Sequence, residues 1–444
     1  MIPRPGLCLL ALVLAAAGPL GGTRPSVILI SVDTLRADHL GAYGSRAGLT
    51  PHLDRFASRA VVFEEAYSSA PLTGPSLSVL LSSHYQHETK ISDNGFPAPS
   101  AVPTLPEVLK EAGYATAAVL ANPVLYGHYG FPAGFDVYAC DFSKEQVARE
   151  ERKAFPATRT TTRALLVARD LRQQPLFLWV HYMDPHGPYL PPGSRPRPDP
   201  KGRAVLPVNG TTGVGGIPAY QYVFGERDPE SYRRRYREEV AYVDREIGRL
   251  LDGLGQQGLL SHTIVIITAD HGESLGEHDY YFAHGEYLYK EALHVPLMVR
   301  GPGLSPGRRA DVVGLVDLVP SLAEVLRLDV GKPMRGVAVF QNPAPLERAI
   351  LAATFPATAT TERYAAIRRG ETLVFSRPDR WELFLSGDES KNVIETARPQ
   401  ARALASELWK LLGRDDLAHL KLPSPIRAID EETAKVFRSL GYLR

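Results

Sequence analysis

The sequence of 444 residues contains only two cysteines, Cys8 and Cys140. Cys8 lies in an apolar run near the N-terminus, so a chain that loses this run keeps Cys140 alone and cannot form an internal disulfide. Without a disulfide framework, a packed apolar core must stabilise the fold. We expect Cys140 to belong to that core rather than to act as a reactive thiol.

An excess of charge of either sign is also missing. The chain has 50 basic and 49 acidic residues, a net charge of +1, and it shows no basic stripe and no nucleic-acid-binding motif. We therefore expect no nucleic-acid partner. Apolar residues make up 44% of the chain and charged residues 22%. This is an ordinary globular composition, and the length suits one large domain with an appendage.

Long apolar runs are absent except near the N-terminus, at residues 6–17. Arg4 precedes this run and small residues follow it at 15–18, a pattern typical of a cleaved export signal. The run is shorter than the roughly 20 residues that a membrane-spanning helix needs. We predict a signal peptide over residues 1–23, a secreted or periplasmic protein, and no stable membrane span. The alternatives are an uncleaved anchor and a buried first strand.

The rest of the chain alternates short β-branched runs with helical patterns. We expect strands at 26–32, 61–67, 114–120, 176–180 and 263–268, and helices at 50–59, 105–112 and 236–254. This alternation predicts an α/β fold with a doubly wound, mostly parallel sheet flanked by helices. A long surface loop, rich in proline and glycine, is expected at 190–229.

The pattern changes after about residue 340. Short strands at 349–352, 364–368 and 372–375 precede a helix at 399–412, which predicts a smaller C-terminal subdomain of sheet plus helix. We therefore divide the chain after the signal segment into a catalytic domain at 24–340 and a C-terminal subdomain at 341–444.

Acidic and imidazole side chains follow two of the predicted strands. Asp33 comes directly after the first strand, and Asp270 and His271 follow the strand at 263–268. Ligands of doubly wound sheets bind beyond the carboxyl ends of the strands, so these side chains are expected to meet there. Carboxylates with an imidazole form a divalent metal site, and the imidazole favours Zn or Mn over Ca or Mg. Each carboxylate can instead cap the following helix.

Thr73 stands before Gly74 and Pro75, where a helix is expected to begin near Ser76. The positive end of a helix suits a tetrahedral oxyanion. A threonine hydroxyl placed there becomes a nucleophile when metal coordination deprotonates it. By its local sequence alone, however, Thr73 is typical of a helix cap.

Four segments resemble, in the same order, the motifs of the sulfatase family. They are residues 32–41 (VDTLRADHLG), 181–189 (HYMDPHGPY), 270–278 (DHGESLGEH), and a tail formed by 381–393 and 440–442. The resemblance covers about residues 26–444. It implies an alkaline-phosphatase-like fold in which Asp33, Asp270 and His271 bind one divalent metal, together with Thr73 at the nucleophile position.

The same resemblance assigns roles in catalysis to two further histidines. His186 would stand near the leaving group and donate a proton to it. His284 falls where sulfatases usually have a lysine that contacts the substrate, so it would stabilise charge on the transferred group or act as an acid. Two acids, Asp38 and Glu273, would orient the metal ligands or take capping and surface roles.

The chain also departs from the family. Sulfatases carry a Cys-x-Pro-x-Arg motif whose cysteine becomes formylglycine, whereas residues 73–77 read TGPSL here. Thr34 replaces a second metal-binding aspartate, and Asn122 stands near the place of a Lys-Trp-His segment. Threonine as nucleophile resembles another branch, the phosphoethanolamine and glycerol-phosphate transferases. These use one metal, an Asp-His pair and an asparagine comparable to Asn122, which would then bind substrate.

We therefore expect a metal-dependent hydrolase of sulfate or phosphate esters that acts through Thr73 on a small-molecule, glycan or lipid ester. Phosphate is favoured because a threonine ester cannot collapse to an aldehyde as a formylglycine hydrate can, and must be cleaved by water or an acceptor. The alternatives are a transferase of phosphoryl head groups and a catalytically inactive binding protein on the same fold.

Overall fold

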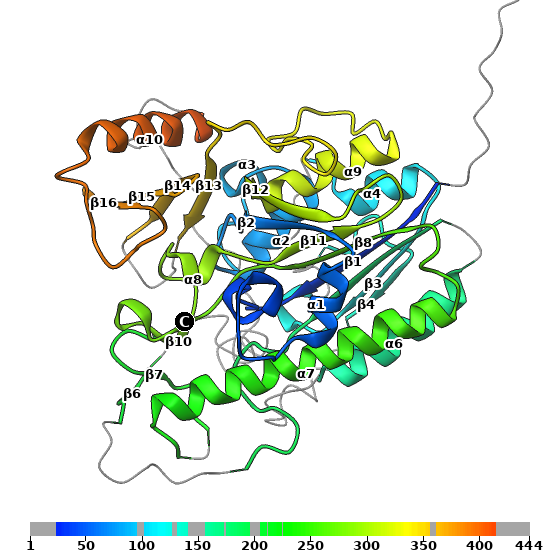
Figure 1. Cartoon of the computed structure of the whole chain (residues 1–444), viewed down its shortest axis with the longest axis horizontal. Helices are drawn as coiled ribbons and strands as arrows, with labels where there is room; N and C mark the ends of the chain where they lie inside the picture. Colours follow the sequence, from blue (N-terminus) through cyan, green and yellow to red (C-terminus); the bar gives the residue numbers. More distant parts are fainter. Residues whose placement is uncertain are drawn as a thin grey trace, which may run out of the picture.

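The structure is a computed structural model of the chain (Figure 1). It describes residues 24–95, 102–126, 131–140, 156–172, 175–195, 205–210, 212–223, 225–355 and 361–413. The predicted signal segment at 1–23 and the predicted tail motif at 440–442 lie outside the described residues.

Eight strands form the central sheet, in the order β12-β2-β11-β8-β1-β5-β3-β4. Their bounds are β1 Ser26–Val32, β2 Val61–Tyr67, β3 Ala115–Leu120, β4 Val137–Ala139, β5 Leu176–Tyr182, β8 Thr263–Ala269, β11 Leu297–Arg300 and β12 Gly307–Gly314. Neighbouring strands run parallel, except that β11 is antiparallel to both β2 and β8. The predicted mostly parallel sheet is confirmed.

Helices cover both faces of this sheet. Figure 1 shows α1, α6 and α7 on one face and α2, α4 and α9 on the other. Their bounds are α1 Pro51–Ala57, α2 Thr73–Ser82, α4 Leu105–Glu111, α6 Ala157–Leu171, α7 Pro229–Gln256 and α9 Leu318–Leu326, with the short α3 Gln86–Thr89 and α8 Lys290–Leu293. The inner strands are covered on both sides, which explains why their sequences are almost continuously apolar.

Strand β5 is two residues longer than predicted, because it includes His181 and Tyr182. In the sequence, their polar groups suggested that the strand had already ended, but both side chains are fully buried. The backbone of β5 continues to pair with β1 in register, with His181 opposite Ser31. The extension therefore carries an imidazole to the carboxyl edge of the sheet.

The C-terminal part is a separate four-stranded antiparallel sheet with one helix packed on it. Its elements are β13 Ile350–Thr354, β14 Arg363–Arg368, β15 Glu371–Ser376, β16 Arg380–Leu385 and α10 Arg398–Leu411. Leu404 and Leu408 of α10 are fully buried in a core shared with this sheet. The smaller sheet-plus-helix part is confirmed, and the predicted boundary at residue 340 falls between α9 and β13.

The described part of the expected loop at 190–229 is mostly irregular, with two-residue strands β6 Val208–Asn209 and β7 Ile217–Pro218. A second small pair, β9 Ser274–Leu275 and β10 Tyr281–Ala283, follows the Asp270 segment. Among the described residues, no helix combines the length and the apolar character that crossing a membrane requires.

Candidate functional site

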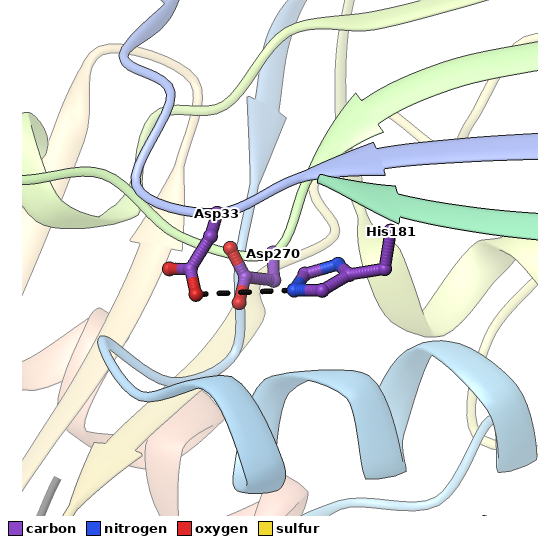
Figure 2. A group of neighbouring side chains, drawn as sticks. All are labelled: Asp33, His181 and Asp270. Atoms are coloured by element: carbon purple, nitrogen blue, oxygen red, sulfur yellow. Dashed lines mark ion pairs between the residues drawn. The ribbon is translucent and has the colours of Figure 1, made fainter. Parts of the chain in front are cut away.

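Three strand ends bring Asp33, Asp270 and His181 together (Figure 2). Asp33 follows β1, Asp270 follows β8, and His181 lies near the end of β5. Because β8, β1 and β5 are neighbours in the sheet, their carboxyl ends adjoin one another. All three side chains are fully buried. The predicted meeting of Asp33 and Asp270 is thus present in the structure, with His181 beside them.

Within the part of the chain that the structure describes, one polar atom from each of these residues is buried without a hydrogen-bond partner. The atoms are Asp33 Oδ1, Asp270 Oδ2 and His181 Nε2. The three side chains offer ligand atoms that lie within 4.8 Å of one another. Burying such groups without partners costs about 1–3 kcal/mol each, and more for charged groups. A divalent cation among them would satisfy all three, so the donor set fits a metal ion.

The electrostatics of this cluster favour a cation as well. Burial raises the pKa of Asp33, and burial together with the charge of Asp33 raises the pKa of Asp270 to about 6. Burial lowers the pKa of His181 to about 4, so its ring is neutral at pH 7. Two carboxylates and a neutral imidazole in one buried place favour a cation among them.

His271 adds a second imidazole to the cluster. Its Nδ1 lies 2.9 Å from the carbonyl oxygen of Gly272, which can only accept, so Nδ1 donates and Nε2 carries the lone pair of the neutral ring. This Nε2 lies 3.7 Å from Asp33 Oδ1 and 3.6 Å from Asp270 Oδ2. Burial by itself lowers the pKa of His271, but the two carboxylates outweigh it and raise the value. A metal ion or a proton would relieve the repulsion between the lone pair and the carboxylates.

Thr73 is the first residue of α2 and is fully buried. The N-cap is Leu72, and no side chain caps the helix at that position, so the interpretation of Thr73 as a helix cap is wrong. Thr73 Oγ1 lies 3.4 Å from Nε2 of His271 and 3.5 Å from Nδ2 of Asn122. The hydroxyl therefore faces the cluster of carboxylates and imidazoles.

Asn122 lies just beyond β3, which neighbours β5 in the sheet. Its Nδ2 donates to Asp33 Oδ2 at 2.5 Å, and its Oδ1 accepts the backbone N–H of Val124 at 2.9 Å. The amide is therefore held in one orientation, with its NH₂ group between Asp33 and Thr73.

Asn94 is a residue that the sequence did not indicate. Its Oδ1 accepts the backbone N–H of Gly74 at 2.8 Å, so it caps α2 from 20 positions further along the chain. A Cβ on Gly74 would lie 3.1 Å from this oxygen, a tighter contact than most Cβ atoms make. Asn94 Nδ2 is buried without a hydrogen-bond partner in the described structure. In the sequence, Asn94 was only part of a turn-like segment, and turns are too common to indicate a functional residue.

His186 and His284 complete a row of three imidazoles. The rings of His186 and His284 are 5.1 Å apart, and those of His284 and His271 are 4.5 Å apart. His186 Nδ1 donates to the carbonyl of Gly187 at 2.7 Å, so Nε2 carries the lone pair of the neutral ring. Burial lowers the pKa of His186 to about 3. The ring is therefore neutral at pH 7, with the proton on Nδ1.

Of the two additional acids, only Glu273 reaches the site. Glu273 Oε1 lies 3.0 Å from His284 Nδ1, and Oε2 accepts the hydroxyl of Tyr189 at 3.0 Å. Burial raises the pKa of Glu273 to about 8. Asp38 instead forms an ion pair with Arg36 and contacts His39, with its own side chain 57% exposed.

The carboxylates and imidazoles lie at the carboxyl edge of a mostly parallel sheet whose fold is alkaline-phosphatase-like. A solved phosphonate monoester hydrolase of Agrobacterium radiobacter superposes with a TM-score of 0.71 at 20% identity, covering 88% of this chain and 96% of that one. A protein solved with its substrate D-glucosamine-2-N,6-O-disulfate gives a TM-score of 0.73 at 20% identity, covering 90% and 100%.

The chain belongs to the sulfatase family, which matches residues 25–328. Choline-sulfatase of Rhizobium meliloti (strain 1021) is 25% identical over 453 residues, covering 84% of this chain and 83% of that protein. The resemblance inferred from the four motifs is therefore confirmed at the level of the family.

Proposed function

We propose that this protein hydrolyses sulfate, phosphonate or phosphate esters through Thr73 and one divalent metal ion. The observation that carries the proposal is the position of Thr73 Oγ1, 3.4 Å from His271 Nε2, which itself lies against the buried carboxylates of Asp33 and Asp270. The substrate class is supported by the relatives, which are named as a choline-sulfatase and a phosphonate monoester hydrolase.

Asp33 and Asp270 would hold the metal together with the imidazole of His181 or of His271. When bound, the ion supplies positive charge that polarises the ester oxygen and lowers the pKa of the threonine hydroxyl. The presence of an imidazole favours Zn or Mn over Ca or Mg.

Thr73 Oγ1 would lose its proton to solvent and attack the sulfur or phosphorus atom. The bond to the leaving oxygen would break, and that oxygen would take up a proton and depart as the alcohol. The NH₂ groups of Asn122 and Asn94 would donate to the oxygens of the transferred group at the N-terminus of α2. Water then cleaves the threonine ester and releases sulfate, phosphonate or phosphate. His186 would take part in proton transfer at the leaving oxygen, and His284, held by Glu273, would stabilise charge on the transferred group.

Turnover of aryl sulfate, aryl phosphate and aryl phosphonate by wild type and by Thr73→Ala tests the nucleophile. We expect the alanine variant to lose at least about a thousandfold in kcat, while Thr73→Ser keeps measurable activity because it retains a hydroxyl. Mass spectrometry of rapidly quenched reactions should find the transferred group on Thr73. Equal turnover by wild type and Thr73→Ala would show that Thr73 is not the nucleophile.

A metal measurement separates this proposal from the inactive binding protein. The purified protein should contain about one divalent ion per chain, and removing it should lower the melting temperature. A protein without divalent metal, and without stabilisation by added metal, would favour the binding protein. Export is also part of the proposal, and N-terminal sequencing of the protein from its native host would test cleavage near residue 23.

A further inference from the structure

The turn that follows β1 has a strained backbone. Thr34 in this turn has a φ of 56°, in the left-handed region. A β-branched residue is disfavoured in that region and persists there only where the surrounding structure holds it. The turn matters to the site because Asp33 directly precedes Thr34, and because the backbone N–H of Thr34 donates to Asp270 Oδ1 at 3.3 Å. Both carboxylates therefore depend on the conformation of this turn.

One tyrosine of the long helix α7 contacts the backbone of this turn at two points. The hydroxyl of Tyr236 donates to the carbonyl oxygen of Thr34 at 2.7 Å and accepts the backbone N–H of Arg36 at 3.1 Å. A hydroxyl group has one hydrogen and two lone pairs, so both bonds form at once. Burial raises the pKa of Tyr236, which keeps the donated proton on its oxygen. The hydroxyl thus bridges the two residues on either side of Leu35.

The ring of Tyr236 is itself held in place by its neighbours. It is fully buried, and it makes edge-to-face contacts with His39 and Tyr189, at 5.0 and 5.5 Å between ring centroids. Tyr189 in turn donates to Glu273, which contacts His284. Helix α7 has 28 residues and crosses one face of the sheet (Figure 1). A packed ring on a long helix therefore presents the hydroxyl to the turn.

We propose that Tyr236 is a positioning residue for the metal ion, because its hydroxyl holds the turn that carries Asp33. The inference rests on the proposed function, in which Asp33 and Asp270 bind the metal. Without the hydroxyl, the buried carbonyl of Thr34 and the N–H of Arg36 lose these hydrogen bonds, and the strained turn relaxes. Asp33 then moves relative to Asp270, and the metal ion binds less tightly. Groups that orient metal ligands contribute about 10- to 100-fold to metal affinity.

Removal of the hydroxyl alone tests the proposal. The metal affinity of full-length Tyr236→Phe is measured by titrating the metal-free protein with Zn²⁺ or Mn²⁺, a measurement that does not depend on turnover. We expect the affinity to be at least about tenfold weaker than that of the wild type. At saturating metal, kcat for an aryl ester should also fall about tenfold or more, because the reacting groups lose their alignment.

Tyr232, one turn earlier on α7, provides a matched control. It is also fully buried, and its hydroxyl donates to the carbonyl of Glu226 at 2.9 Å and accepts the N–H of Val223 at 3.3 Å. These groups belong to the loop before α7 and not to the turn after β1. Tyr232→Phe should therefore lower the melting temperature by a similar amount, while its metal affinity stays within about twofold of the wild type.

Where Tyr236→Phe does not fold, p-aminophenylalanine at this position keeps a donor to Thr34 but accepts poorly from Arg36. Metal affinity should then still fall about threefold or more. A metal affinity within about twofold of the wild type in the variant of Tyr236, or an equal loss in Tyr232→Phe, would overturn the positioning role. A wild type that neither binds metal nor hydrolyses aryl esters would instead contradict the proposed function, and the positioning role with it.

Discussion

His181 Nδ1 lies 2.8 Å from the hydroxyl oxygen of Ser31 on the adjacent strand. The same hydroxyl oxygen accepts the indole N–H of Trp179 at 2.8 Å. The parallel register of β1 and β5 places Ser31 directly opposite His181, so the contact follows from strand pairing. The ring of His181 is held by it, and His181 Nε2 lies 3.8 Å from Asp33 Oδ2.

This relationship leads to a prediction about the metal ligands. If His181 binds the metal, His181→Ala should weaken metal affinity more than about a hundredfold. Ser31→Ala, which removes only the partner that orients the ring, should weaken it about 10- to 100-fold. His271→Ala serves as the comparison, since His271 is the alternative imidazole ligand. Metal titration with elemental analysis measures all three. Unchanged affinity in His181→Ala, with a large loss in His271→Ala, would assign the site to His271.

A second prediction distinguishes the roles of the side-chain oxygen and of the NH₂ group of Asn94. Asn94→Asp keeps an oxygen that can accept the N–H of Gly74, but it replaces the NH₂ group with an oxygen. The cap on α2 should be kept, because a carboxylate is also favourable at a helix N-terminus, and any loss of stability should come from burying the second oxygen. The value of kcat/KM for aryl esters should fall about a hundredfold or more, because one donor to the oxyanion is lost.

Asn94→Ala is the control for that experiment. It removes both the oxygen and the NH₂ group, and should also lower the free energy of unfolding by about 1 kcal/mol. Steady-state kinetics and chemical denaturation measure the two effects. Full activity in Asn94→Asp would show that Asn94 caps α2 and does nothing more.

A third prediction concerns pH in the metal-free protein. The pKa of Asp270 is raised from 3.8 to about 6. Between these values the folded state binds more protons than the unfolded chain, so this group makes the free energy of unfolding fall as pH rises from about 4 to about 6. Metal binding needs ionised carboxylates, so stabilisation by metal should grow over the same interval.

Melting curves with and without Zn²⁺ or Mn²⁺ at pH 5 and pH 7.5 check this dependence. The rise in melting temperature on adding metal should be larger at pH 7.5, and Asp270→Asn should remove most of it. The same rise at both pH values would contradict the assignment of Asp270 as a metal ligand.

A fourth prediction concerns stability away from the site. Asp317, which is 1% exposed, accepts two hydrogen bonds from Arg348, at 2.7 and 2.6 Å, and also accepts the N–H groups of Gly314 and Val337. Arg348→Gln would leave a buried carboxylate without its cation and should cost about 3–5 kcal/mol in the free energy of unfolding.

Arg398→Gln, in an exposed pair on α10, is the matched substitution and should leave the free energy of unfolding almost unchanged. Urea denaturation of both variants compares them. Equal stabilities would mean that the pair of Arg348 and Asp317 contributes no more than a surface ion pair.

The sequence by itself determined where the main carboxylates stand. The continuous apolar runs before Asp33 and Asp270 define buried parallel strands, and the carboxyl ends of such strands meet at one edge. The local pattern of apolar and polar residues was therefore sufficient to predict the sheet and the smaller C-terminal part. It was also sufficient to predict that Asp33, Asp270 and His271 lie close together. The ordered motifs predicted the family and indicated Thr73 as the candidate nucleophile.

The tertiary structure decided which polar atoms face one another. His181 lies inside β5. In the sequence, a histidine after an apolar run looks the same whether it belongs to the strand or follows it. Asn94 reaches Gly74 only because a later turn packs on the start of α2. The hydrogen bond from His186 to the carbonyl of Gly187 sets the position of its proton, which the motif alone left open. Such contacts depend on strand register and on packing between segments distant in the chain, and neither is encoded in any short stretch of residues.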